Sequence, residues 1–219
     1  MSIMKPVKLF QLSKMERDAL REVMSIGMGH SSTALSKLLD EKIDMELMTL
    51  EVLPIKYLSK KLGESYQLST GVYVRITGDI NGTVSFILSR DSSTTLADIL
   101  MHKKIGTTKV LGRVERSALE ETTSILTGHY LTAMSNFLHI NAIPTPPSTV
   151  FHLSGSIIDF ILLGVDRSIE YGIVVHIKFG REYETVRSDF IVLLDRQSLD
   201  RIIESINNTY LKDEGMGEE

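Results

Sequence analysis

Apolar residues recur at helical spacing in two long segments of the chain. Ser13 and Glu16 form a capping-box pattern, and the apolar residues that follow, beginning with Ala19 and Leu20, are spaced as on one face of a helix. This pattern predicts a helix that begins near residue 14. A second helical pattern spans about residues 112–138.

The segments between and after these helices alternate or run apolar and are rich in β-branched residues, as strands are. Gly78-Asp79 and Asn81-Gly82 mark a turn between two of them. Two shorter helices are expected at 94–104, after the cap Asp91-Ser92-Ser93, and at 195–206. We expect strands at 42–53, 67–77, 82–89, 148–153, 157–165, 169–180 and 183–194. The pattern therefore predicts an α+β fold.

Residues 16–39 and 115–138 are two copies of one segment. With a constant offset of 99 they match at 13 of 24 positions, where an unrelated pairing gives about one or two. The order of helix, strands and helix repeats as well, over about residues 13–104 and 112–208. We expect one pseudo-symmetric domain over 1–211, followed by a disordered acidic tail at 212–219.

The amino-acid composition argues against several classes of protein and of binding site. The chain has no cysteine, 24 Lys plus Arg against 28 Asp plus Glu, and its basic residues are scattered. This argues against disulfides, thiolate metal sites and a nucleic-acid surface. No apolar run has the length of a membrane span or of a signal peptide's core. We expect a cytoplasmic protein with no nucleic-acid or membrane partner.

The polar positions shared by the two copies are the candidates for function. Glu22 and Ser25 are three residues apart, as are Glu121 and Ser124, and on a helix such pairs lie side by side. Each copy therefore presents a carboxylate beside a hydroxyl. The alternative is a solvated helix face whose residues survived the duplication.

Glycines and histidines also recur in the copies. Gly27, Gly29 and Gly128 each cost about 1 kcal/mol relative to alanine inside a helix, so we expect close approach of another backbone there. His30 and His129 lack further ligands at a recognisable spacing. We expect packing or capping roles for them and no metal. Triad and phosphate-loop motifs are absent.

The Glu-x-x-(polar)-Ile-x-x-Gly pattern, present twice, and the segment TGDINGTVSFIL resemble the CheC/CheX/FliY family of chemotaxis phosphatases, most closely CheC. The family signature is Asp or Ser, three residues, Glu, two residues, Asn, twenty-two residues, Pro, and CheC-type members carry it once in each half. In the first half, Asp18 and Glu22 match. Ser25 stands in place of Asn, and Met48 in place of Pro.

The second half is closer to this signature. Ser117, Glu121 and Pro147 match, while Ser124 again replaces Asn. If catalysis survives in only one half, we expect it in this one, so Glu121→Ala should reduce activity more than Glu22→Ala.

The resemblance implies a CheC-like fold of two helix-and-sheet repeats that present their long helices on the surface. It implies a substrate as well, the aspartyl phosphate of a CheY-like response-regulator receiver. In the family the Glu contacts the receiver and the Asn amide orients the attacking water, while the receiver supplies Mg²⁺ and a lysine. No cofactor of the chain's own is expected.

Serine in place of asparagine leaves a shorter side chain with fewer hydrogen-bonding groups. We expect a loss of about 10²- to 10³-fold in rate, by analogy with removal of one transition-state donor. His30 and His129 are the nearest substitutes but point elsewhere on the helix. One hypothesis is therefore an aspartyl-phosphate phosphatase, and the other a non-catalytic module that binds a receiver or the deamidase CheD. A flagellar rotor role is a third.

Overall fold

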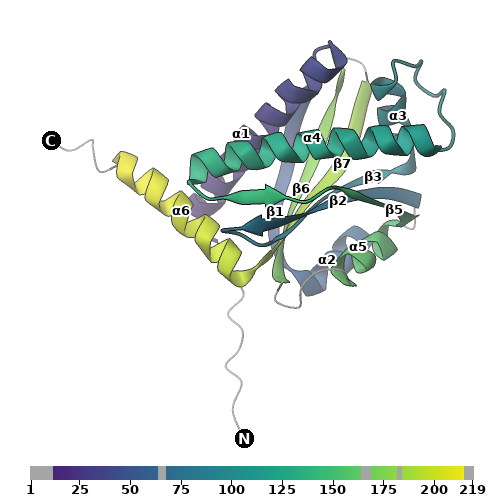
Figure 1. Ribbon diagram of the computed structural model, residues 1–219. Helices are drawn as coiled ribbons and strands as arrows, with labels where there is room; N and C mark the ends of the chain where they lie inside the picture. Colours follow the sequence, from purple (N-terminus) through teal and green to yellow (C-terminus); the bar gives the residue numbers. More distant parts are fainter. Residues whose placement is uncertain (1–11, 64–67, 164–168, 182–183, 215–219) are drawn as a thin grey trace, which may run out of the picture.

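Helices and strands occur in the same order in the two halves of the chain. The computed structural model describes residues 12–63, 68–163, 169–181 and 184–214 (Figure 1). The elements are α1 (Lys14–Leu39), β1 (Asp44–Pro54), a 3₁₀ turn (Ile55–Tyr57), α2 (Leu58–Gly63), β2 (Leu68–Gly78), β3 (Gly82–Ser89), α3 (Arg90–Leu100), α4 (Arg113–Leu138), β4 (Ala142–Pro144), β5 (Ser148–Leu153), α5 (Ser154–Leu163), β6 (Ile169–Arg181), β7 (Glu184–Asp195) and α6 (Arg196–Glu214). The duplicated α+β architecture expected from the sequence is confirmed.

The strands form one antiparallel sheet that interleaves the two halves. The order is β1-β6-β7-β3-β2-β4, with β5 also paired to β2. β1 of the first half pairs with β6 of the second, and β4 and β5 of the second half pair with β2 of the first. β3 and β7 join the halves at the centre. Each half therefore completes the other's sheet.

Helices cover both faces of the sheet. α1 and α4 cross on one face, with α3 and α6 at the ends, while α2 and α5 lie on the opposite face (Figure 1). The larger apolar core lies beneath α1 and α4, and a smaller one lies beneath α2 and α5. None of the described helices combines the length and apolar character needed to cross a bilayer.

Matching ends show how closely α1 and α4 correspond. Ser13 and Glu16 form the predicted capping box, so α1 begins at Lys14. The helices end at Asp40 and His139, which are 99 residues apart and both left-handed, with φ of 51° and 53°. The two long helices are thus fixed to the same length of 26 residues.

Two expectations about the second half are wrong. Residues 157–163 of the expected strand 157–165 belong to helix α5, and 164–168 lie outside the described residues. Ile157, Ile158 and Ile161 are buried at helical spacing, but so short an apolar run does not distinguish a strand from a helix. Residues 212–214 of the expected tail belong to α6, and 215–219 lie outside the described part.

Candidate functional site

The crossing of α1 and α4 is built on a glycine. A Cβ on Gly27 would lie 2.4 Å from a ring carbon of Tyr130, so only glycine lets that ring pack against α1. Ser31 makes the reciprocal contact, because its Oγ donates to the carbonyl of Leu126 on α4 at 2.8 Å. Ser31 and Tyr130 occupy equivalent positions in the two copies, so the crossing is a near-symmetric contact with one large and one small partner.

Tyr130 anchors this crossing. Its side chain is 2 % exposed, and its ring packs edge-on against Phe190, with centroids 4.8 Å apart. Its hydroxyl donates to the sulfur of Met24. Burial raises the pKa of this phenol, which stays protonated. The structure corrects the expectation at Gly27: the group that approaches closely is the Tyr130 side chain and not another backbone.

The candidate residues of the first half lie along the outer face of α1. Asp18, Glu22 and Ser25 are all exposed. The hydroxyl of Ser25 donates to the carbonyl of Arg21, one turn earlier, at 2.8 Å. Its proton is therefore directed at its own helix, while its lone pairs remain able to accept a hydrogen bond from water.

The candidate residues of the second half lie on α4 in the same relation. Ser117 and Glu121 are exposed, and Ser124 is partly buried. Neither Glu121 nor its counterpart Glu22 forms an ion pair with any described residue, so both carboxylates face outward. We call Asp18, Glu22 and Ser25 the first stripe, and Ser117, Glu121 and Ser124 the second stripe.

A β-bulge lies at Met48, where the family signature has proline. Leu47 pairs with Ile177 and Thr49 with His176, so Met48 has no partner in the ladder. Arg21 of α1 donates to the carbonyl of Leu47 at 3.1 Å. This bond ties the bulge to the helix turn that carries Glu22 and Ser25. Sequence reasoning missed Arg21, because its partner is 26 residues away.

The second half has a bulge at the equivalent place. Pro144 pairs with Ile76 and Ser148 with Tyr73, so three residues, 145–147, face two, 74–75. Proline lacks an N–H and interrupts the ladder, which divides this strand into β4 and β5. Each half thus carries one extra strand residue at the equivalent place, at Met48 or among 145–147.

Gly29 and Gly128 differ from Gly27. A Cβ at either position would meet nothing within 4 Å, so no group of the described chain requires glycine there. The close approach expected at these two positions is not found within the chain. Each lies one turn beyond the serine of its stripe, and its carbonyl accepts a hydrogen bond from Thr33 or Thr132. Each stripe is therefore followed by a glycine whose backbone is not covered by a side chain.

His30 and His129 do not pack or cap, contrary to expectation. Both are exposed and line one groove of about 820 Å³ between α1 and α4, together with Thr33 and Lys37. Within the described ranges no group of three or more His, Cys, Asp or Glu side chains is placed to hold a metal ion.

Each stripe offers an outward carboxylate beside a hydroxyl and a stretch of open backbone. Such an arrangement can contact a partner and accept a hydrogen bond from a water molecule. Activating a nucleophile on the chain itself needs a base hydrogen-bonded to it, and neither serine forms such a bond among the described residues.

The chain is similar to several known proteins. A model of the CheC-like family matches residues 15–46 and 114–151, which contain both stripes and Pro147. The chain is 29% identical to the CheY-P phosphatase CheC of Bacillus subtilis over 92% of its own length and 96% of that protein. It is 30% identical to the flagellar motor switch phosphatase FliY of the same organism, over 62% of this chain and 35% of FliY.

The crystal structure of Thermotoga maritima FliY has the same fold, with a TM-score of 0.76 and 21% identity, over 91% of this chain and all of that one. Fold and stripes together describe a pseudo-symmetric α+β protein with two candidate surface sites on paired helices. The chain is therefore similar to the CheC-like family in both long-helix segments, and to the two phosphatases CheC and FliY of Bacillus subtilis.

Proposed function

We propose that this protein binds the phosphorylated receiver of a CheY-like response regulator and promotes hydrolysis of its aspartyl phosphate. Glu22 and Glu121 contact the receiver. Ser25 and Ser124 occupy the positions that orient the attacking water. Asp18, Ser117 and Pro147 support these positions. The repeated Glu–Ser pair on the exposed faces of two crossed helices is the observation that carries the proposal.

The proposed hydrolysis requires few catalytic groups from the chain itself. Phosphoryl transfer depends mostly on positioning and charge, and the receiver brings Mg²⁺ and a lysine to its own phosphoryl group. The chain therefore needs no cofactor of its own. The Ser25 hydroxyl already donates to Arg21, so it acts as an acceptor: a water bound to it points one hydrogen at the serine and a lone pair toward phosphorus.

The second candidate function is binding without hydrolysis. Serine replaces the family asparagine in both stripes, and a hydroxyl supplies one fewer distinct hydrogen-bonding group than an amide. Under this alternative the same carboxylates dock a receiver and leave its phosphate in place. Binding of CheD stays a prediction from the family resemblance, and a cytoplasmic location stays a prediction from composition.

The test is the decay of a phosphorylated CheY-like receiver from the same organism, with and without the protein. We expect faster decay with the native chain and decay at the receiver's own rate with Glu22→Ala/Glu121→Ala. Glu204→Ala, which removes an exposed glutamate from α6, is the matched control and should behave as native. Unchanged decay with the native protein, together with binding that depends on both glutamates, would favour the binding module.

A further inference from the structure

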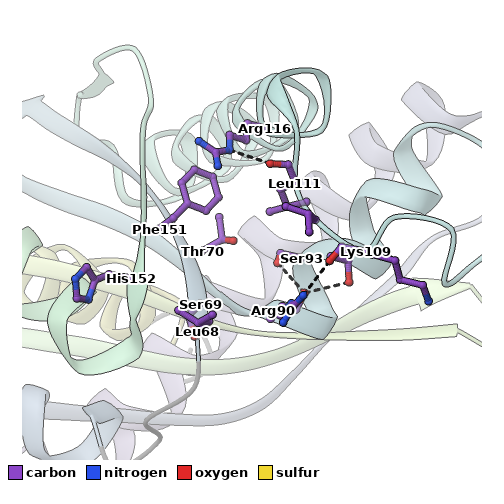
Figure 2. A pocket seen from close by; sticks show the side chains of 12 residues that line it. Leu68, Ser69, Thr70, Arg90, Ser93, Lys109, Leu111, Arg116, Phe151 and His152 are labelled. Carbon is purple, nitrogen blue, oxygen red and sulfur yellow. Dashed lines mark hydrogen bonds between the residues drawn. The ribbon is translucent and has the colours of Figure 1, made fainter.

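A hollow of about 270 Å³ lies between β2, α3, β5 and the start of α4, and neither Glu22 nor Glu121 lines it (Figure 2). Leu68, Val110 and Phe151 give it apolar walls, and buried hydroxyl residues such as Thr70 and Ser93 lie beneath them. Val110 is 73% exposed and Leu68 is 55% exposed, so two neighbouring apolar side chains at this hollow are open to a partner.

Two arginines at this pocket are held in place by the segment that connects α3 to α4. The Nε of Arg116 donates to the carbonyl of Leu111 at 3.1 Å, and its guanidinium carbon lies 4.1 Å from the centre of the Phe151 ring. Arg90 donates to the carbonyl of Lys109 at 3.2 Å. Figure 2 shows Arg116 lying over Phe151. The outer nitrogens of Arg116 have no acceptor among the described residues.

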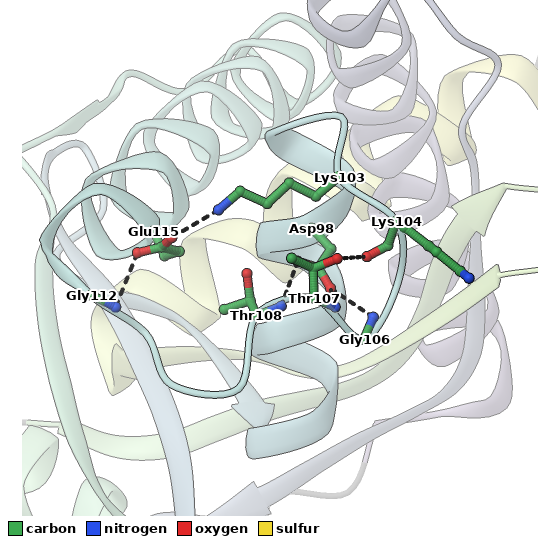
Figure 3. A network of polar contacts seen from close by, with 8 residues as sticks. All are labelled: Asp98, Lys103, Lys104, Gly106, Thr107, Thr108, Gly112 and Glu115. Atoms are coloured by element: carbon green, nitrogen blue, oxygen red, sulfur yellow. Dashed lines mark hydrogen bonds and ion pairs between the residues drawn. The ribbon is translucent and has the colours of Figure 1, made fainter.

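The connecting segment is itself fixed by a buried carboxylate. Asp98 accepts hydrogen bonds from the backbone amides of Gly106, Thr107 and Thr108, at 2.8, 3.0 and 2.9 Å (Figure 3). Glu115 of α4 accepts from the amide of Gly112 at 3.0 Å and from Lys103 at 3.1 Å. A segment held at both ends presents its side chains in a preformed arrangement, which lowers the cost of binding.

The charge at this pocket is opposite to that of the chain. Arg90, Lys109 and Arg116 line it, no Asp or Glu does among the described residues, and the whole chain has a net charge of −4. A ligand that fits must bring negative charge. It must also bring an apolar group, because a bare phosphate ion would leave the walls unused, and the volume suits about one or two side chains.

We propose that this pocket binds an acidic peptide segment of a protein partner. An apolar side chain of the segment enters between Val110 and Phe151, and carboxylates on either side of it pair with Arg116, Arg90 and Lys109. The pocket adjoins the second stripe, since Arg116 precedes Ser117 and β5 follows Pro147. The proposal does not depend on hydrolysis at either stripe.

The test is an NMR titration of the ¹⁵N-labelled full chain with a hexapeptide in which leucine and phenylalanine are flanked on each side by an aspartate and a glutamate. Its neutral counterpart, with asparagine and glutamine, and inorganic phosphate are titrated in parallel. The variants are Arg116→Gln and Lys109→Gln, whose folding is checked from their own spectra. Lys60→Gln, an exposed charge loss on α2 across the sheet, is the matched control.

We expect saturable shifts of the amides of Thr70, Val110 and Phe151 with the acidic peptide only. Arg116→Gln should weaken the affinity for this peptide about tenfold or more, and Lys109→Gln should weaken it less. Lys60→Gln should leave the affinity unchanged. Phosphate that binds as tightly would make this a simple anion site and overturn the proposal. Equal binding of the neutral peptide, or no saturable shift at these amides, would overturn it too.

Discussion

The two stripes share one geometry but differ in how their surroundings hold them. In the first half, the serine hydroxyl is exposed and bonded to its own helix, and the unpaired bulge residue is Met48. In the second half, Ser124 is partly buried, and the equivalent bulge contains Pro147. A proline has fewer backbone conformations to lose on folding. The second site is therefore the more constrained, and the comparison teaches that a duplicated pair of side chains can be retained while the surroundings that hold it diverge.

The largest expected effect comes from restoring asparagine. Ser124→Asn should raise the rate of receiver dephosphorylation by about 10²- to 10³-fold, because it returns an amide donor and acceptor to the water-orienting position. Ser25→Asn should raise the rate less, since its neighbouring bulge lacks the proline. Stopped-flow measurement of receiver dephosphorylation compares the two. A larger gain from Ser25→Asn would reverse the ranking of the halves.

Replacing each of three helix glycines by alanine tests how closely its surroundings pack. Gly27→Ala should destabilise the fold by about 1–3 kcal/mol, because its methyl group collides with the Tyr130 ring. Gly29→Ala and Gly128→Ala should instead stabilise it by about 0.5–1 kcal/mol, since each methyl meets open space and alanine is the better helix former. Urea unfolding measures all three.

The same two stabilising changes should slow dephosphorylation under the proposed function, because each adds a methyl group to the face on which the receiver docks. A variant that is more stable but less active separates docking from folding. Native activity in both Gly29→Ala and Gly128→Ala would show that the receiver does not approach the backbone there.

The stability of the fold should depend on pH through Asp98, which holds the segment between the two halves. Burial acts to raise the pKa of Asp98, but hydrogen bonds from Thr108 and from the amides of Gly106 and Thr107 outweigh it, so the pKa lies below its ordinary value of 3.8. A lowered folded pKa stabilises the fold fully above 3.8, and this stabilisation is lost as pH falls through the folded value. Asp98→Ala should cost about 1–3 kcal/mol at neutral pH, because it leaves buried amides unpaired.

This loss should shrink as pH falls below 3.8, because the native protein then loses part of the stabilisation that the charged carboxylate gives. Urea unfolding of the native chain and of Asp98→Ala between pH 3 and pH 7 measures the difference. A constant difference across that range would contradict the account of Asp98 as a charged acceptor.

The smallest expected effect is that of Pro147→Met, which gives the second bulge the residue found in the first. It should destabilise the fold by about 0.5–1 kcal/mol through the unfolded chain, since no ladder hydrogen bond is regained. Thermal unfolding checks this. Met48→Ala, a change at the equivalent exposed bulge, is the control and should alter stability less.

Much of this arrangement could be predicted because its signals are local. The capping box of Ser13 and Glu16 and the helical spacing after it mark where α1 begins, and the internal repeat transfers that reading to α4. The Glu–Ser spacing alone places each pair on one helix face. The stripe residues themselves were therefore accessible from the sequence, although their function stays a prediction.

What could not be predicted depends on contacts between distant residues. The short run in α5 is helical because Ile157, Ile158 and Ile161 together cover the second core, which its own sequence does not reveal. The bulge at Met48 is defined only by its pairing with β6. The cationic pocket joins Arg90 to Arg116 across a turn fixed by Asp98, and no spacing in the sequence signals that closure.

The most direct test of the central claim is the dephosphorylation rate of a CheY-like receiver with Glu22→Ala and Glu121→Ala measured separately, beside Glu204→Ala. The account predicts that both changes slow the reaction, Glu121→Ala more than Glu22→Ala, while Glu204→Ala leaves it unchanged. Equal losses would contradict the greater role of the second stripe, and native rates in both variants would remove the glutamate-centred site altogether.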